Sequence, residues 1–573
     1  MPWNGSRYRK HLGLPAAWEG THIDLYVEGA YSVATYYLNG QLLGLHTTGY
    51  TSAIFRLDNA TAPGLRFGPG AENILAIFVD ATEAACTGWW YEGGGLFRNT
   101  YLISTDPIHV VPHGLFAPAY FTGGFRPRAT PALGMTAATA HLRPSATIVV
   151  GTDAAAGSVT LAFSLYPLRG AVAIGTVEVK AGPLAAGVLT TVSAPELVVN
   201  DTELWTVPRP QLHTLSCSVS TGGKVVDVMN ETVGLRSSHW DPALGFVLNE
   251  QRVKMRGFCN HESFAGVGMA VADRINLFRL QSMRGLGGNA IRASHNPPNP
   301  AMLKLADRLG VMFLDENRVF AVGDQFTQNM RDLVSRDRNH PSVMFYSFCN
   351  EPGCNNGDKS APTQPSYDFK AVTYEIDGTR PVTGNMCVQW GSCPTEEQYL
   401  TGKDNNMSQI LDIQGFSHVP AWFFADYHAV WPNKPLVASE CCSCETQRGE
   451  DSDLGPYGPT CPLPSKHCIS NASVFYSNFN IDCVKEQTQW SNALDFVGGT
   501  FVWTLHDCER PGIDRDRPTR KHPIVSSRSL PFLATACVAG LVAQSHFPPS
   551  SSLLSLCTVH RRGNSVGLTA LAR

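Results

Sequence analysis

Residues 344–353 read MFYSFCNEPG, a largely apolar run that ends in an amide and a carboxylate. The apolar part includes aromatic residues and stops at Pro and Gly, which is typical of a buried β-strand. Polar side chains are uncommon in buried strands, so Asn350 and Glu351 at the strand's end indicate a function at that point. The stretch predicts a strand whose carboxyl end faces a functional site.

Short apolar runs that read as strands occur seven more times between residues 253 and 505. Amphipathic segments such as AVADRINLFRLQSMRGLG, PAMLKLADRLG and TQNMRDLVSRDRN lie between them. The eight predicted strands are VKMRGFC (253–259), GNAIRAS (288–294), GVMFLD (310–315), SVMFYSFC (342–349), RPVTG (380–384), LDIQGFS (411–417), KPLVAS (434–439) and GTFVWTL (499–505). Eight βα units at roughly 30-residue spacing predict a (β/α)8 TIM barrel over residues 238–509.

The N-terminal part has a different pattern. From residue 7 to about residue 108, runs such as THIDLYVEGAY and ENILAIFVD alternate apolar and polar residues, and LNGQ carries an Asn-Gly hairpin signal. This predicts a β-sandwich over residues 1–110. A Pro/Gly-rich link is expected over residues 107–131.

Short strands spaced by about ten residues then predict an immunoglobulin-like sandwich over residues 128–237. SATIVVGTD, SVTLAFSLY and HTLSCSVST are its clearest strands, and Trp205 and Leu212 are expected in its core.

The last segment, residues 510–573, has no βα organisation and is rich in Ser, Pro and small apolar residues. No convincing eighth helix follows GTFVWTL. We expect this tail to be irregular, either because it is disordered or because the gene model is faulty at this end, and we favour the second explanation.

Length and composition limit the function. A chain of 573 residues is too long for one core and predicts about three domains. The net charge of −4 and the lack of a basic run argue against a nucleic-acid partner. No uninterrupted apolar stretch of membrane-spanning length occurs, so no membrane span is expected. A homo-oligomer is left open.

Cysteine usage and acceptor sequences bear on the compartment. The chain has 16 Cys, clustered at positions 441, 442, 444, 461, 468 and 483, and Asn-x-Ser/Thr sequences begin at positions 4, 59, 200, 230, 406 and 471. Both favour a secretory or vacuolar location with some disulfides. No signal peptide precedes MPWNGSRYRKHLGLP, so this reading requires a start upstream of Met1. Zinc binding by the Cys cluster is the weaker alternative, since no paired CxxC motifs occur.

Every predicted barrel strand ends in polar or aromatic residues, which suits a ligand rich in hydroxyl groups. In strand order they are Asn260, His261 and Glu262; His295 and Asn296; Asp315, Glu316 and Asn317; Asn350 and Glu351; Asn385; His418; Glu440; and Trp503 and His506. In a barrel these ends converge on one rim, which is where active sites lie.

Glu351 and Glu440 stand out because each directly follows an apolar strand, and their strands lie on opposing sides of the ring. Retaining glycoside hydrolysis uses two carboxyl groups about 5 Å apart. Taken alone, a Glu after a strand is more often a helix cap or a salt-bridge partner. Glu316 is either a third acid of the site or a structural one. Asp315 is expected to orient a neighbouring basic residue such as Arg292.

The other candidates also have structural alternatives. His261 and His295 could hold loops rather than bind a ligand. The prolines of HNPPNP stop the strand that precedes them. Trp503 is either a core residue or a platform for a sugar ring.

The sequence strongly resembles glycoside hydrolase family 2 over residues 3–509. YRKHLGLPAAWEG…TSAIFRL and WWYEGGGLFRNTYL resemble its N-terminal jelly roll, assigned here to residues 1–110. LWTVPRPQLHTL with VGLRSSHWDPALGFVLNEQRVKMRGFCNHE is similar to its immunoglobulin-like domain passing into the barrel. GNAIRASHNPPNPAMLKLADRLGVMFLDE and RDRNHPSVMFYSFCNEPG resemble its two barrel signatures, and the second of these is very specific.

The resemblance implies roles for particular residues. Glu351 would be the general acid/base, and Asn350 would contact the sugar 2-hydroxyl. KPLVASE resembles the nucleophile strand, which makes Glu440 the nucleophile. Asp80 would reach the sugar from the first domain. The positions that match the family's pocket lining are His261, Arg292, His295 and Trp503.

Three departures from the family pattern matter. Phe320 and Val322 stand where some members place magnesium ligands, so we expect no metal and no cofactor. His418 stands where the family usually has a Tyr beside the nucleophile, and it could take over that hydrogen bond. The Asn-x-Lys element of β-glucuronidases does not follow Glu440.

The expected function is a retaining hydrolase of terminal β-glycosides, most like a β-galactosidase, with a carbohydrate substrate. The alternatives are a β-glucuronidase or β-mannosidase of the same family, or a catalytically impaired carbohydrate-binding protein.

Overall fold

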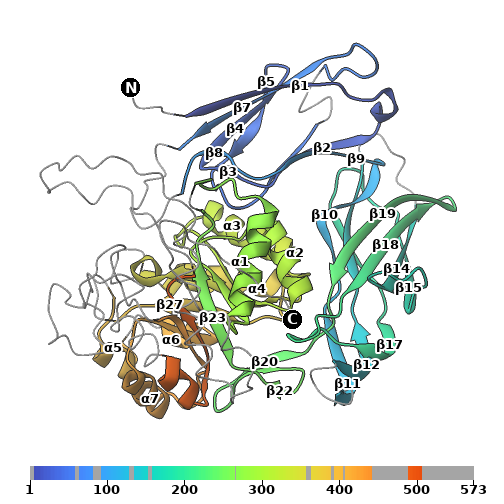
Figure 1. The fold of residues 1–573 in the computed structure, drawn as a ribbon. Helices are drawn as coiled ribbons and strands as arrows, with labels where there is room; N and C mark the ends of the chain where they lie inside the picture. The colour runs from blue at the N-terminus through green and yellow to red at the C-terminus, as the bar shows by residue number, and fades with distance from the viewer. Residues whose placement is uncertain are drawn as a thin grey trace, which may run out of the picture.

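A computed structural model describes residues 5–57, 64–81, 92–127, 134–151, 158–264, 266–355, 363–388, 393–403, 407–441 and 488–505. Two β-rich regions and a barrel make up these residues (Figure 1). Several predictions fall outside the described residues. They concern the Cys cluster from position 442 onward, His506, the helix expected after the eighth strand, and the tail over residues 510–573.

The first region is a sandwich of short antiparallel strands, as predicted. Its main sheet has the order β1-β7-β4-β5, a second sheet has the order β6-β2-β9, and β3 pairs with β8. The elements are β1 (Ser6–Leu12), a 3-10 turn (Ala16–Trp18), β2 (His22–Val27), β3 (Ala30–Tyr31), β4 (Val33–Leu38), β5 (Gln41–His46), β6 (Ala53–Arg56), β7 (Asn73–Asp80), β8 (Gly95–Leu96) and β9 (Thr100–Thr105). Asn39 and Gly40 both have positive φ and join β4 to β5, as the hairpin signal predicted.

The second region is a sandwich of three antiparallel sheets, β10-β13-β16, β11-β12-β17 and β15-β14-β18-β19. Its strands are β10 (Ile108–Phe116), β11 (Ala119–Pro127), β12 (Met135–Leu142), β13 (Ser145–Val150), β14 (Val159–Pro167), β15 (Gly175–Ala181), β16 (Thr190–Ser193), β17 (Leu197–Glu203), β18 (His213–Thr221) and β19 (Lys224–Val233). Alternate residues of β14 and β18 are buried, which fits the period-two pattern of their sequences.

The predicted Pro/Gly link over 107–131 is wrong over residues 108–127, which form β10 and β11. Gly123 and Gly124 have positive φ and lie where the β11–β12 register shifts, so the glycines form a bulge inside a strand. Pro112 lies in a similar register shift of β10. We therefore propose that the second domain begins near Ile108 rather than at residue 128; the other predicted domain limits stay predictions.

The barrel is closed and has the eight predicted strands in sequence order. Every neighbouring pair is parallel, including β30 and β23, which close the ring. The strands are β23 (Met255–Asn260), β24 (Ala290–Ala293), β25 (Met312–Glu316), β26 (Val343–Asn350), β27 (Val382–Met386), β28 (Ile413–Ser417), β29 (Leu436–Cys441) and β30 (Val497–Val502). A small sheet of β20 (Ser238–Asp241), β21 (Gly245–Leu248) and β22 (Gln251–Arg252) precedes the barrel. The labelled α-helices are α1 (Asp273–Gly285), α2 (Pro300–Leu309), α3 (Asp324–Asp337), α4 (Thr363–Ile376), α5 (Glu396–Leu400), α6 (Met407–Ile410) and α7 (Ala421–Val430). Residues 488–493, just before β30, are also helical.

The sequence of α2 explains both of its ends. The side chain of Asn299 accepts a hydrogen bond from Ala301 N, and Pro300 occupies the first turn, where no backbone donor is needed. Gly310 ends the helix at φ 67°, and a Cβ there would collide with the Val207 carbonyl oxygen. Only Gly fits this position, because the second region lies directly against the helix end.

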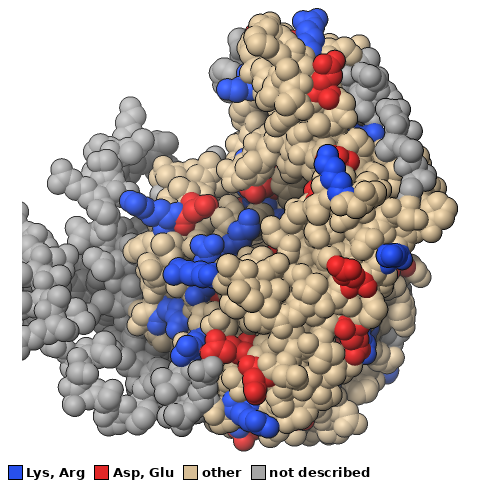
Figure 2. All heavy atoms as spheres, turned by 90° about the vertical axis from the view of Figure 1, so that its right-hand side faces the viewer, with Lys and Arg blue, Asp and Glu red and all other residues tan. Residues whose placement is uncertain are grey.

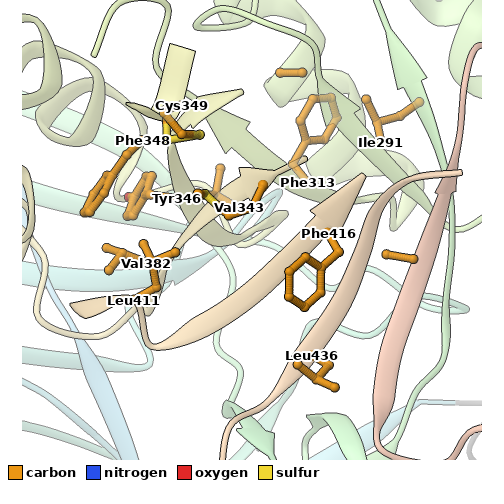
Figure 3. Packing of buried hydrophobic residues seen from close by; sticks show 14 of the residues in the cluster. Ile291, Phe313, Val343, Tyr346, Phe348, Cys349, Val382, Leu411, Phe416 and Leu436 are labelled. Carbon is orange, nitrogen blue, oxygen red and sulfur yellow. A yellow bond between two sulfur atoms is a disulfide. The ribbon is translucent and has the colours of Figure 1, made fainter. Parts of the chain in front are cut away.

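The barrel core lies between strands and helices (Figure 3). Phe313, Tyr346, Phe348 and Phe416 are almost completely buried there. Trp205 is also buried, as predicted, but it belongs to a cluster with the barrel residues Met255, Met312 and Phe345 rather than to the sandwich core. Its Nε1 donates to the Asp307 carbonyl oxygen at 2.8 Å. It therefore joins the second region to the barrel.

On the face drawn in Figure 2, basic and acidic side chains are interspersed over a surface that is mostly neither. This agrees with the small net charge of −4. None of the helices in the described part of the chain is long and apolar enough to cross a membrane.

Candidate active site

Arg292, at the end of β24, is the centre of the polar cluster at the barrel's carboxyl rim. Its side chain is fully buried. Its Nε donates to Glu316 Oε2 at 2.8 Å, and one terminal nitrogen donates to Glu440 Oε1 at 2.5 Å. The other donates to Asn350 Oδ1 at 2.6 Å. One guanidinium thus ties together strands β24, β25, β26 and β29 at their tips.

Glu440, in β29, is held as a carboxylate. Burial opposes its ionisation, but the charge of Arg292 and the hydrogen bond from His418 outweigh burial and hold the pKa of Glu440 below its ordinary value. Its side chain is only 4% exposed. A buried carboxylate that is kept ionised at a barrel rim has the properties of a nucleophile.

Glu351 follows β26 directly and has φ 47°, in the left-handed region that side chains other than Gly seldom adopt. This turn of the backbone ends the strand at its tip. The Glu351 side chain is 17% exposed, against 4% for Glu440, so Glu351 is the more accessible of the two carboxylates. Greater access to solvent suits the group that exchanges protons with a leaving group and with water.

His418 joins the two carboxylates. Its Nε2 donates to Glu440 Oε2 at 2.8 Å and lies 3.8 Å from Glu351 Oε1. One ligand-type atom from each of these three side chains lies within 4.8 Å of the other two. The carboxyl oxygens are therefore close enough for retaining geometry, which needs about 5–5.5 Å, rather than the 6.5–9.5 Å of inverting enzymes.

The same three side chains could also hold a cation, since each offers a donor atom. The magnesium ligands of some family members are another matter: Phe320 is buried against the rings of Phe348 and Phe369, and Val322 is exposed. Neither side chain offers a ligand atom at those positions.

Two histidines and a tryptophan form one wall of the site. His295 stacks on Trp503 with ring centroids 5.3 Å apart, and His261 meets the Trp503 ring edge-on at 4.9 Å. Burial, followed by the neighbouring His295 ring, lowers the pKa of His261 to about 3, so His261 is neutral. Its Nδ1 donates to the Ser294 carbonyl oxygen at 2.7 Å.

Glu316 fixes the position of His295, one of the residues of this wall, through a hydrogen bond. Its Oε1 accepts from His295 Nδ1 at 2.8 Å, and its Oε2 accepts from Asn385 Nδ2 at 2.6 Å. Burial and the charge of Arg292 lower the pKa of His295, which keeps the imidazole neutral. Glu316, left open between two roles by the sequence, therefore holds the Arg292 and His295 side chains in place.

The prediction that Asp315 orients Arg292 is wrong. Neighbouring residues of a strand point to opposite faces, so Glu316 faces the barrel interior and Asp315 faces the outer helices. There, burial and the nearby charge of Asp337 raise the pKa of Asp315 well above its ordinary value. Asp337 itself pairs with Arg336 of α3.

Asp80 is the predicted site residue that the described contacts do not place at the rim. It ends β7 in the first region, and its backbone carbonyl oxygen accepts a hydrogen bond from Ser32. Its approach to a sugar stays a prediction. The remaining predicted residues lie together at the rim. They are Asn350, Glu351, Glu440, His261, Arg292, His295, His418 and Trp503.

Ion pairs between the first region and the rim were not foreseen. Arg98 donates to both oxygens of Glu262, at 2.9 and 2.5 Å, and Arg318 binds Glu92 at 2.8 Å. Arg98 and Glu262 are both buried. No local pattern marks such pairs, because their members are more than 160 positions apart in the chain.

Two disulfides flank the site at the ends of β26 and β27. Cys349 bonds Cys354, and Cys387 bonds Cys393. The first closes a loop that contains Asn350 and Glu351. Some disulfides were expected in this chain, without assigned pairs; the short spacing within CNEPGC was the signal that could have revealed the Cys349–Cys354 pair.

The hydrogen bond from His418 makes a testable prediction. In His418→Phe, Glu440 loses a donor that lowers its pKa, so its pKa should rise and the acid limb of kcat/KM should move to higher pH. A hydrogen bond to a charged group contributes about 1.5–3 kcal/mol, so kcat/KM should also fall by about 10- to 100-fold. The pH–rate profile on an activated aryl glycoside measures both effects.

His418→Tyr is the matched control, because a phenol can donate to the same oxygen. It should recover most of the lost rate and return the acid limb toward its original position. An unshifted profile in His418→Phe would show that this hydrogen bond has no part in keeping Glu440 ionised.

Comparisons with known proteins agree with this picture. The model described as "Glycosyl hydrolases family 2, TIM barrel domain" matches residues 244–329 and 321–444, and the model described as "Glycosyl hydrolases family 2" matches residues 135–236. Together they cover more than half of the chain.

Among curated proteins, a β-galactosidase of Bacteroides ovatus is 27% identical over 88% of this chain and 61% of its own length. A β-glucuronidase of Bacteroides fragilis is 24% identical over 90% of this chain and 73% of its own length. Among solved structures, a glycosyl hydrolase family 2 member from Bacteroides cellulosilyticus has a TM-score of 0.70 at 23% identity, covering 89% of this chain and 62% of that one. The chain thus spans about 60% of the length of several proteins that it matches.

Proposed function

The chain belongs to glycosyl hydrolase family 2, and from this premise we propose that it hydrolyses terminal β-glycosides with retention of configuration. The observation that carries the proposal is the pair of carboxylates, Glu351 and Glu440, bridged by His418 with donor atoms within 4.8 Å. Arg292 supports it further, because it keeps Glu440 ionised in a buried position.

In the first step, the Glu440 carboxylate attacks the anomeric carbon while Glu351 transfers its proton to the glycosidic oxygen. The bond to the aglycone breaks, the aglycone leaves as an alcohol, and the sugar is esterified to Glu440. The negative charge of ionised Glu440 close by favours the protonated form of Glu351 that this step needs.

In the second step, the Glu351 carboxylate removes a proton from water as the water oxygen attacks the anomeric carbon. The ester bond to Glu440 breaks, the free sugar leaves, and both carboxyl groups return to their starting states. Two inversions at one carbon give net retention.

The pocket residues have supporting roles in this proposal. Asn350 is held by Arg292 at 2.6 Å, so its amide is positioned to contact a sugar hydroxyl beside the anomeric carbon. Trp503 stacks with His295 and provides an aromatic wall against which a sugar ring can lie.

For the sugar, we propose a β-galactoside rather than a β-glucuronide. A glucuronide needs a cation for its carboxylate, and the chain has ECCSCETQRGED after the nucleophile instead of the Asn-x-Lys element of β-glucuronidases. The relatives named above include both activities, so β-glucuronide and β-mannoside hydrolysis are the alternatives. A carbohydrate-binding protein without activity is less well supported, because the acid, the nucleophile and their positioning residues are all present.

A panel of aryl β-glycosides tests the proposal. The purified chain is assayed on the galactoside, glucuronide, mannoside and glucoside with the same aryl leaving group. We expect the highest kcat/KM on the galactoside. A preference for the glucuronide would overturn the choice of sugar but not the mechanism, whereas sugar binding without turnover on any substrate would support the binding-protein alternative.

A further inference from the structure

A second group of metal-ligand side chains lies far from the barrel rim in the sequence, at the seam between the first two regions. His22 and Asp24 lie in β2, and His109 lies at the start of β10. One ligand-type atom from each lies within 4.8 Å of the other two. Figure 1 shows β2 and β9 lying next to the end of β10.

The backbone explains why these side chains converge. His22 and Asp24 are two positions apart in a strand and therefore point to the same face of the sheet. The next residue on that face, Tyr26, bonds His113 of β10 at 3.1 Å. The seam is thus formed by one face of β2 against β10, and the rings of His22 and His109 lie 4.2 Å apart between centroids.

His109 is prepared as a ligand by its own neighbours. Its Nδ1 lies 2.8 Å from the Asp106 carbonyl oxygen, which can only accept, so Nδ1 carries the proton and Nε2 carries the lone pair. Metal-bound histidines are usually fixed in this way, with the second ring nitrogen donating to a carbonyl or carboxylate.

Asp24 supplies the negative charge. Its Oδ1 accepts from His22 Nε2 at 2.9 Å, and both side chains are less than 10% exposed. Asp227 adds a second carboxylate near the seam, where its Oδ2 accepts from Val110 N at 2.8 Å. Arg56 lies opposite Asp24 in the β2–β6 register, and its positive charge would repel a bound cation.

We propose that His22, Asp24 and His109 bind a divalent transition-metal ion such as zinc, which links the first two domains. Two imidazoles and a carboxylate are a set of ligands that zinc accepts, with water completing the coordination. Donor atoms in a tetrahedral zinc site lie about 3.3 Å apart, so small side-chain rotations close the remaining distance. On binding through Nε2, the metal takes the place of the hydrogen bond between His22 and Asp24, and the one proton of the neutral His22 ring then lies on Nδ1.

The test is a titration of the full chain, freed of metal by a chelator, with zinc chloride by calorimetry and with cobalt chloride by visible absorption. Because Glu351, His418 and Glu440 form another group of possible donors, the titrations are run on the parent chain and on Glu440→Gln. We expect a zinc site that persists in Glu440→Gln, with the visible bands of cobalt bound by nitrogen and oxygen.

His109→Ala and Asp24→Asn should each weaken zinc binding at this site by at least about tenfold. Asp24→Asn is nearly isosteric, so it carries the test if His109→Ala fails to fold. His113→Ala is the matched control: it removes a histidine of the same seam that lies outside the group, and it should leave zinc affinity unchanged. Unchanged affinity in both ligand variants, or a zinc signal lost only in Glu440→Gln, would overturn the proposal.

Discussion

Glu440→Gln is expected to lower kcat on an activated aryl β-galactoside by about four orders of magnitude or more, the scale seen when a covalent nucleophile is removed. Gln keeps the size of the side chain and an oxygen that can accept from Arg292, but it cannot form the glycosyl ester. Because only the nucleophile is lost, the decrease should not depend on the leaving group. Steady-state kinetics with two aryl glycosides of different leaving-group acidity measure it.

Glu178→Gln is the matched control for this variant, since it makes the same chemical change at an exposed position of β15. It should leave kcat unchanged. Thermal unfolding of Glu440→Gln distinguishes lost chemistry from lost folding, because the change also removes a charge that pairs with buried Arg292. Normal turnover by folded Glu440→Gln would exclude Glu440 as the nucleophile.

Glu351→Ala is the second variant with a large expected effect, and its effect should depend on the substrate. A poor leaving group needs protonation, so kcat/KM on an alkyl β-galactoside should fall by about 10²–10⁴-fold, the usual contribution of general acid catalysis. A nitrophenolate leaves without a proton, so formation of the glycosyl ester from that substrate should be affected much less.

Hydrolysis of the ester still needs Glu351 as a base, and therefore the ester should accumulate in Glu351→Ala. Azide needs no base and is small enough to occupy the space that the side chain leaves. Added azide should raise turnover of the nitrophenyl substrate and give a β-glycosyl azide, which chromatography and NMR identify. An equal loss on both substrates, without azide rescue, would contradict the acid/base role.

The barrel could be predicted from the sequence because its signal is local and repeated. Each strand is a short apolar run, each helix has its own periodicity, and the carboxyl ends of parallel strands must meet at one rim. This is why Glu351 and Glu440, 89 positions apart, could be placed near each other without coordinates. His418 could be placed at the same rim in this way, and the family resemblance implied its position beside Glu440.

Two predictions were wrong because the sequence pattern does not decide which face of a strand a residue occupies, or whether a glycine lies in a link or in a strand. Asp315 and Glu316 are adjacent acids in one strand, and only the phase of the strand decides which of them meets Arg292. Gly123 and Gly124 were taken as part of a link, whereas they form a bulge within β11. In both cases the residue types were informative, but the register was not encoded locally.

Contacts between domains were beyond sequence reasoning altogether. Arg98 and Glu262 are a buried pair at the rim, and His22 and His109 meet at the seam, yet each pair comes from segments with no shared pattern. Such contacts depend on how the folded domains dock. They attach the first region to both of its neighbours.

The most direct test of the central claim is to trap the intermediate on Glu440. An activated 2-deoxy-2-fluoro-β-galactoside forms the glycosyl ester but hydrolyses it slowly, because fluorine destabilises the oxocarbenium-like transition state. After incubation and proteolysis, mass spectrometry should find one fluorosugar on the peptide that contains Glu440, and none in Glu440→Gln. A label on Glu351 or Glu316 instead, or unlabelled protein that still turns over the parent galactoside, would contradict the assignment.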